Sequence, residues 1–343
     1  MTVEAHAPGR VVLIGDHTDH AGGLTLAMAI DLGTTVTGER GGDRLVLDSA
    51  QLDGVADWPA VPSRDRPPDG PAWGRFVGAV AEVMGGTGGF RGHISSTVPV
   101  GAGLSSSAAL ELALAGAFGF QGTPLELARL GQRAEHRAVG VPCGLLDQLT
   151  GACGVAGHAL LIDFDTLAVT PVPVPDDLDV IVVHSGQERA LAGSAYGERR
   201  AQCEAAADQV GPLPRASEAD VARISDPVLR RRARHVAGEC ARVRAAADAL
   251  RIGDGAAVGL LMLESHRSLR DDFEVSTAAL DETVSRLMTM DGVLGARLTG
   301  AGFGGCVVAL CQAGAVPDPS AVTGRGWRVR PSAGADQREV GTT

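Results

Sequence analysis

The chain has 343 residues, of which 45% are hydrophobic and 21% are charged, and its formal net charge is −11. This length favours two domains, because single hydrophobic cores stop growing at roughly 250–300 residues. The acidic balance argues against a nucleic-acid or membrane-surface partner, although it does not oppose a local site for an anionic nucleotide.

Hydrophobic periodicity indicates a mixture of strands and helices along the chain. Strands are expected over residues 11–14, 24–37 and 179–184, and helices over 76–84, 105–118, 125–139 and 276–290. A strand, a glycine loop and a second strand are expected over 296–310. A long amphipathic helix is marked by seven apolar residues at alternating spacings: Leu229, Ala233, Val236, Cys240, Val243, Ala247 and Leu250. Its other face is rich in arginine, which favours a solvated surface.

Two stretches interrupt this pattern and suggest how the chain is divided. Residues 53–72 are rich in Pro, Asp and Gly, which is typical of a surface excursion. Residues 169–176 contain three prolines and are the best candidate for a boundary between two halves. We therefore predict domains over 1–175 and 176–343, and an α+β (mixed α/β) fold.

The sequence carries no signal for export or membrane insertion. Its first residues have neither a basic nor an apolar region of the kind found in signal peptides, and no run of 18 apolar residues occurs. The six cysteines are scattered, without a Cys-x-x-Cys pair. We expect a cytoplasmic protein with reduced thiols that is a monomer or a weak homo-oligomer.

The most informative segment is a glycine–serine loop at residues 101–107, which follows a β-branched run and precedes an Ala/Leu-rich helix. Its glycines let backbone N–H groups approach an oxyanion, and the helix start adds partial positive charge. The chain contains no lysine, which excludes P-loop NTPases, protein-kinase-like enzymes and Schiff-base mechanisms. The loop therefore favours a nucleotide phosphate bound by backbone, hydroxyls, Mg²⁺ and arginine. A flexible loop that only caps a helix is the alternative.

A dense polar cluster follows the apolar run 11–14. Asp16, His17, Asp19 and His20 lie within five residues, and such a set is not core material. A metal site, a capped turn and a site for a polyhydroxyl ligand all fit the composition. The last is favoured, because Asp oxygens accept from sugar hydroxyls and His both donates and accepts.

Two further segments point to chemistry. Asp147 follows a helix that carries Glu135, and its carboxylate either caps a helix or takes a proton from an attacking hydroxyl. Residues 300–305 contain four glycines and form either a plain hairpin or a loop whose backbone closely approaches a second ligand or the first glycine loop.

Taken in order along the chain, these segments resemble the GHMP small-molecule kinase superfamily and, within it, the galactokinase family. The resemblance rests on residues 8–23, 98–109 and 295–307, and on three stretches typical of galactokinases at 143–163, 190–203 and 264–276. It implies a two-domain GHMP kinase fold with the active site in the inter-domain cleft. It also implies ATP- and Mg²⁺-dependent phosphorylation of the C1 hydroxyl of a hexose, D-galactose to galactose 1-phosphate.

The resemblance also implies residue roles. Asp147 matches the catalytic base and Arg10 the cation beside it, whereas Ser107 and Glu135 match the Mg²⁺ ligands. The ATP phosphate loop matches Gly101, Ala102, Gly103, Leu104, Ser105, Ser106 and Ser107. The sugar contacts match Asp16, His17, Thr18, Asp19 and Tyr196.

Two positions depart from the family, which usually carries Glu at position 16 and Tyr at position 20, where this chain has Asp16 and His20. These departures leave open a kinase that acts on a C6-altered hexose or a sugar-like cyclitol. The sequence also leaves open a non-catalytic sensor of sugar and ATP, and a metal hydrolase built on the polar cluster.

Overall fold

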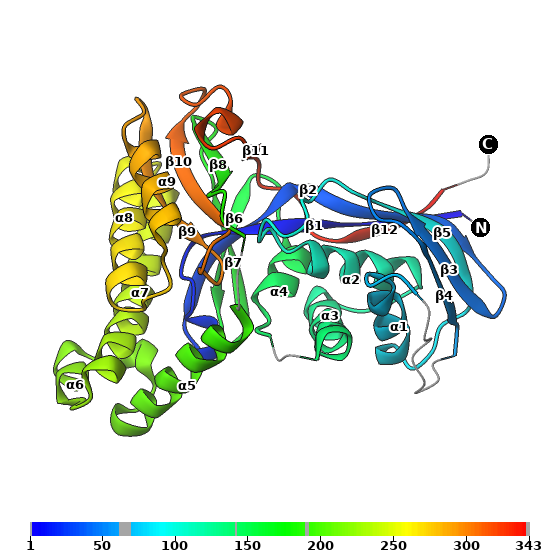
Figure 1. Ribbon diagram of the computed structural model, residues 1–343, viewed down its shortest axis with the longest axis horizontal. Helices are drawn as coiled ribbons and strands as arrows, with labels where there is room; N and C mark the ends of the chain where they lie inside the picture. The colour runs from blue at the N-terminus through cyan, green and yellow to red at the C-terminus, as the bar shows by residue number, and fades with distance from the viewer. Residues whose placement is uncertain (1, 62–69, 141–142, 189–191, 341–343) are drawn as a thin grey trace.

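The computed structural model describes residues 2–61, 70–140, 143–188 and 192–340, which form two sheets with helices packed against them (Figure 1). The first sheet has eight strands, and its main path runs in the order β12-β1-β2-β5-β3-β4. These strands are β1 (Thr2–Ile14), β2 (Leu24–Arg40), β3 (Arg44–Ser49), β4 (Val55–Pro59), β5 (Phe90–Ser96) and β12 (Asp336–Val340). A side branch adds β6 (His158–Asp163), which pairs with β2, and β7 (Ala168–Pro173), which pairs with β6.

One layer of helices lies against the first sheet, below it in the view of Figure 1. It consists of α1 (Gly74–Val83), α2 (Ser106–Ala117), α3 (Pro124–Val139) and α4 (Leu146–Cys153). Because α2 is rich in alanine, it packs closely on β1 and β2. A capping box at Thr123 and Glu126 fixes the start of α3, which agrees with the helix predicted over 125–139.

The second sheet has the order β11-β8-β10-β9 and is covered by α8 and α9, whereas α7 packs on α8 and on the first sheet, and α5 and α6 pack on α7. Its strands are β8 (Leu178–His184), β9 (Val293–Thr299), β10 (Cys306–Gln312) and β11 (Gly326–Val329). The helices are α5 (Ala192–Val210), α6 (Glu218–Arg223), α7 (Pro227–Arg251), α8 (Gly255–Asp271) and α9 (Ala278–Met288). Of the described helices, none has the length and apolar character needed to cross a bilayer.

The two stretches expected to interrupt the fold contain strands instead. Val55–Pro59 forms β4 at the end of the first sheet, so the prediction of a surface excursion is wrong there, and residues 62–69 lie outside the described part. The proline-rich stretch forms β7, which pairs only with β6. An edge strand tolerates proline because its missing N–H is not needed by a second neighbour. We propose the division near residue 175 with β12 added to the first domain.

The prediction for α7 is confirmed for its apolar stripe and wrong for part of its other face. Six of the seven stripe residues are buried, and Leu229 is partly buried. Arg232, however, is only 1% exposed, and its guanidinium donates to Gln202 (2.7 Å) and Glu274 (2.5 Å). This arginine is therefore not solvated, and its hydrogen bonds link α7 to neighbouring segments.

Candidate functional site

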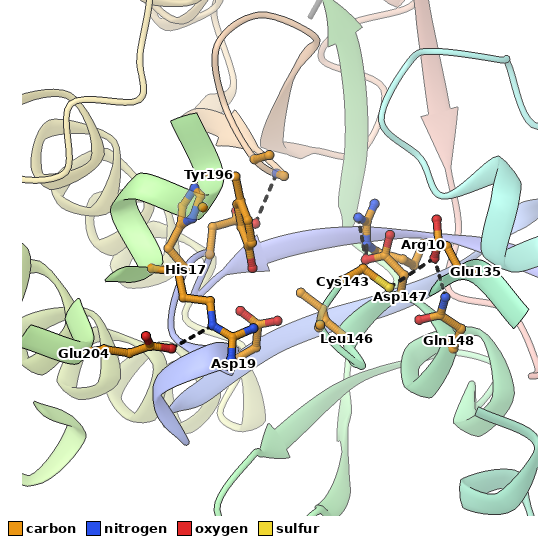
Figure 2. A pocket seen from close by; sticks show the side chains of 16 residues that line it. Arg10, His17, Asp19, Glu135, Cys143, Leu146, Asp147, Gln148, Tyr196 and Glu204 are labelled. Atoms are coloured by element: carbon orange, nitrogen blue, oxygen red, sulfur yellow. Dashed lines mark hydrogen bonds and ion pairs between the residues drawn. The ribbon is translucent and has the colours of Figure 1, made fainter. Parts of the chain in front are cut away.

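A cavity of about 640 Å³ lies between the two halves of the molecule (Figure 2). The first half contributes Arg10, Asp16, His17, Asp19, Glu135, Cys143, Gly144, Leu146, Asp147 and Gln148. The second half contributes Tyr196, Gly197, Arg200, Glu204, Gly300 and Ala301. Seven of the fifteen residues predicted to carry chemistry therefore border one cavity, although they are spread over positions 10 to 196 of the sequence.

Asp147 lies at one end of the cavity with both carboxylate oxygens engaged. Oδ1 accepts from Arg10 Nε at 2.8 Å and lies 2.6 Å from Nη2, whereas Oδ2 accepts from the Ser105 hydroxyl at 2.5 Å. Asp147 stands in the first turn of α4, where Leu145 is the N-cap, so the interpretation of Asp147 as a helix cap is wrong. The start of α4 places partial positive charge beside this carboxylate.

The glycine–serine loop adjoins this end of the cavity through its backbone. Arg10 Nη1 donates to the carbonyl oxygen of Gly103 at 2.7 Å, and the Arg10 N–H donates to that of Leu104 at 3.1 Å. Gly101 and Gly103 have φ of 75° and 78°, and Ser105, the N-cap of α2, has φ of 62°. These left-handed positions turn the chain sharply into the helix, which leaves the first N–H groups of α2 facing outward from its start.

Ser107 and Glu135 are brought together, as expected for ligands of one cation. The Ser107 hydroxyl donates to Glu135 Oε1 at 2.9 Å, and Gln148 donates to Glu135 Oε2 at 2.6 Å. A hydroxyl and a carboxylate are hard oxygen donors of the kind that Mg²⁺ prefers. The donor set therefore fits this ion.

Asp16 borders the cavity, but protein groups engage its carboxylate. Oδ1 accepts from the Gly300 N–H at 3.1 Å, and Oδ2 lies 2.8 Å from Arg297 Nη2, off the direction of a hydrogen bond. Burial raises the pKa of Asp16 to about 6, and the charge of Arg297 opposes the rise. Sequence reasoning missed Arg297; the available signal was a charge inside the apolar strand β9.

We define the polar turn as residues 15–19. Some of its other side chains border the cavity, and others point into the protein beneath it. His17 is buried, and burial holds its pKa well below the ordinary value, so its ring is neutral and has one donor and one acceptor nitrogen. Asp19 lies against Gly144, where a Cβ would overlap its carboxylate. Thr18 does not border the cavity, because its hydroxyl donates to the Leu24 carbonyl at 2.7 Å.

Tyr196 closes the cavity from α5. Its ring lies 5.6 Å from the His17 ring and edge-on to the His20 ring at 6.1 Å. Burial raises the pKa of its phenol, so the hydroxyl stays protonated and can donate a hydrogen bond. Residues 190 and 191 of the matching stretch 190–203 lie outside the described part.

The geometry also bears on two interpretations that the sequence left open. Within the ranges described, no three His, Cys, Asp or Glu side chains gather as a metal site, which gives the metal-hydrolase interpretation no support. Residues 300–305 join β9 and β10 as a hairpin, so that interpretation is confirmed. The same loop approaches Asp16 of the polar turn through Gly300, and its close approach to a ligand stays a prediction.

Three family models match the chain. They are the galactokinase galactose-binding signature (residues 2–40), the GHMP kinases N terminal domain (74–155) and the GHMP kinases C terminal domain (246–321). The chain is 43% identical over 330 residues to a galactokinase of Homo sapiens, covering 91% of this chain and 84% of that protein. It is 40% identical over 353 residues to a galactokinase of Chloroflexus aggregans, covering 95% and 88%.

Solved structures agree with this likeness. A Lactococcus lactis galactokinase in complex with galactose superposes with a TM-score of 0.89 at 31% identity, covering 98% of this chain and 95% of that one. A mevalonate kinase at 21% identity and a TM-score of 0.68 shares the fold alone. The mixed α/β architecture, the cavity between the halves and the sequence likeness agree, and the chain belongs to the galactokinase family of GHMP kinases.

Proposed function

We propose that this protein transfers the γ-phosphoryl group of ATP to the C1 hydroxyl of D-galactose and releases galactose 1-phosphate and ADP. The observation that carries the proposal is the cluster of Arg10, Asp147 and Ser105, where the cavity meets the glycine–serine loop. A carboxylate that faces a polyhydroxyl site beside a phosphate loop is suited to take a proton from an attacking hydroxyl. The relatives named above are galactokinases, which supports galactose as the acceptor.

The chain's own residues divide the work of the reaction. Asp147 accepts the proton of the C1 hydroxyl, while Arg10 balances the carboxylate charge and holds the loop through Gly103. His17, Asp19 and Tyr196 offer donors and acceptors for the other hydroxyls. We propose that Ser107 and Glu135 hold Mg²⁺, which when bound would neutralise the phosphate oxygens. Catalysis then consists of positioning and charge stabilisation.

A non-catalytic sensor would bind the sugar and ATP but would release no ADP. The loop serines and Asp147, which phosphoryl transfer needs, are all present. Asp16, which together with His20 motivated a C6-altered substrate, accepts from the Gly300 N–H and is paired with the Arg297 charge, so its carboxylate is held by protein groups at the cavity wall. The monomeric or weakly oligomeric state and the cytoplasmic location expected from the sequence stay predictions.

The test is ADP release with Mg-ATP and D-galactose, with 6-deoxygalactose and an inositol as competing acceptors. We expect turnover with galactose that falls at least about a thousandfold in Asp147→Ala, because the proton acceptor is lost. Asp248→Ala, at an exposed position of α7, is the control and should keep full activity. Turnover only with 6-deoxygalactose or the inositol would show that the substrate is an altered sugar or a cyclitol. Galactose binding without any turnover would favour a sensor.

A further inference from the structure

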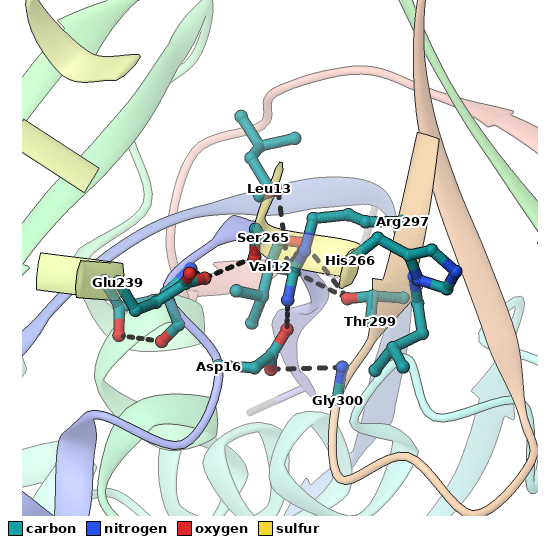
Figure 3. A network of polar contacts seen from close by, with 12 residues as sticks. Val12, Leu13, Asp16, Glu239, Ser265, His266, Arg297, Thr299 and Gly300 are labelled. Carbon is teal, nitrogen blue, oxygen red and sulfur yellow. Dashed lines mark hydrogen bonds and ion pairs between the residues drawn. The ribbon is translucent and has the colours of Figure 1, made fainter. Parts of the chain in front are cut away.

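A buried network of polar contacts adjoins the polar turn (Figure 3). At its centre is Glu239 of α7, which is 0% exposed and does not border the cavity. Its Oε1 accepts from the Gly15 N–H at 2.9 Å and from the Ser265 hydroxyl at 2.5 Å. Its Oε2 accepts from Arg242 Nε at 2.8 Å. One carboxylate thus joins α7 and α8 to the first residue of the turn.

The three partners of Glu239 are all donors, and this explains why the residue is an acid. A buried carboxylate is stable only when its oxygens are paired and its charge is balanced. Burial acts to raise the pKa of Glu239, but His235, Arg242, Arg297 and the Ser265 hydroxyl outweigh it and lower the pKa below the ordinary value. Glu239 is therefore an anion at neutral pH. A Gln at this position would direct N–H groups toward donors.

The backbone at Gly15 has little freedom to move without this contact being lost. Gly15 has φ of 104°, and a Cβ there would lie 2.7 Å from the Leu24 carbonyl oxygen. Its own carbonyl oxygen accepts from the Thr25 hydroxyl at 2.8 Å. Both polar groups of the Gly15 backbone are therefore fixed, the N–H by Glu239 and the carbonyl by Thr25.

A second residue of α7 holds the peptide between Asp16 and His17. His235 Nε2 lies 3.2 Å from the carbonyl oxygen of Asp16, and Nδ1 lies 3.0 Å from the Ser268 hydroxyl. The orientation of His17 and Asp19 is thus set by two nearby peptides, one before Gly15 and one after Asp16, that α7 anchors. The glycine–serine loop is held differently, through Arg10.

We propose that Glu239 is a positioning residue for the sugar: it orients the polar turn through the Gly15 N–H and so tunes galactose binding, without a direct role in ATP binding. The inference rests on the proposed function, because it assumes that His17 and Asp19 contact the sugar. Removing the charge should loosen the turn and weaken sugar affinity. The phosphate end of the site should be nearly unaffected.

The experiment compares Glu239→Gln with Glu282→Gln, a matched control on the exposed face of α9 whose carboxylate also pairs with an arginine. The dissociation constant of galactose without ATP is measured by calorimetry, and KM is measured for both substrates. We expect Glu239→Gln to raise the galactose dissociation constant and KM about tenfold, the size expected for a lost charge-assisted hydrogen bond, with KM for ATP changed less than about twofold. The control should match the parent.

If Glu239→Gln does not fold, as judged by the loss of a cooperative unfolding transition, two milder variants take its place in the test. Ser265→Ala leaves the carboxylate in place and removes one donor, so we expect a rise of about threefold in the galactose dissociation constant. Glu239→Asp keeps the charge and should recover part of the loss. Equal rises in both KM values, or an unchanged galactose dissociation constant in folded variants, would overturn the proposal. If the parent itself fails to bind galactose, the proposed function fails instead.

Discussion

Arg10 is the side chain through which the proton acceptor and the phosphate loop are joined. Its guanidinium contacts the Asp147 carboxylate with two nitrogens and the Gly103 carbonyl with the third. Only a planar group with donors on three nitrogens can make both contacts at once, and an ammonium group cannot replace it. The absence of lysine from the chain agrees with this use of arginine.

We therefore expect Arg10→Lys to lower kcat about a hundredfold while KM for galactose changes less than about threefold, because the lost contacts act on the transferring charge. Steady-state kinetics with Mg-ATP and galactose measures both constants. Arg286→Lys, the same change at an exposed pair on α9, should leave both at parental values. A large rise in KM with normal kcat would contradict the assigned role of Arg10.

Part of the site was predictable from the sequence. The resemblance to galactokinases implied roles for Arg10, Asp147, Ser107 and Glu135, and the structure brings these residues together as two contacting pairs. The buried network of polar contacts that adjoins the polar turn was not expected. Glu239 and His235 occupy helical positions beside an apolar stripe, where the sequence alone cannot distinguish a solvated charge from a buried one that finds donors in distant segments.

At the scale of elements, α8 and β9 approach each other at two glycines. A Cβ at Gly259 would overlap the carbonyl oxygen of Leu294, and one at Gly295 would overlap that of Gly259. Because both obstacles are backbone, no side-chain rotation can relieve them. The close approach sets the position of α8, which carries Ser265 beneath the polar turn.

Gly259→Ala should lower the free energy of unfolding by about 2 kcal/mol, since forced displacement of the helix outweighs the gain in helix propensity. The free energy is obtained from urea unfolding. Gly238→Ala on α7 is the matched control, because its Cβ would meet only the flexible end of Arg242, and it should be neutral or stabilising by up to about 1 kcal/mol. Destabilisation of similar size in both variants would show that the backbone contact is not the cause.

Local patterns predicted helices better than edge strands. The limits of α3 and α9 lie within about two residues of the predictions, because a 3.6-residue period extends over several turns. Strands β4 and β7 were missed because their composition resembles that of loops. Each pairs with the strand just before it in the chain, and as an edge strand it needs neither a complete row of N–H donors nor an apolar run.

At the scale of the whole molecule, the two halves share an apolar core. One buried cluster includes Val11 and Leu26 from the first sheet, Val182 and Val308 from the second, and Val243 from α7. Domains that behave independently usually meet through smaller and more polar interfaces. We therefore expect the halves to unfold together, and the stability of the whole molecule to reflect groups buried at their junction.

His235 is such a group. It is surrounded by Glu239 and Arg242 of its own helix, Arg297 of β9 and the backbone of Asp16, and burial lowers its pKa to about 4. Its ordinary pKa is 6.5, so between these values the unfolded chain binds a proton that the folded chain does not, and stability falls as pH falls.

From pH 7 to pH 5, this residue should cost the parent about 2 kcal/mol of the free energy of unfolding. Urea unfolding of the parent and of His235→Gln at both pH values measures the difference between their losses. Comparing the two proteins cancels the other groups that titrate in this range. An equal loss in both would mean that His235 takes up its proton without unfolding.

The strand order of the second sheet has a consequence for synthesis on the ribosome. β8 is made first but lies in the interior of its sheet, and its neighbours β10 and β11 are made only after α5 to α9. A nascent or truncated chain that stops before β10 therefore exposes the backbone and apolar side chains of β8 without a partner. Such fragments should depend on chaperones, and the second half should become protease-resistant only late in translation.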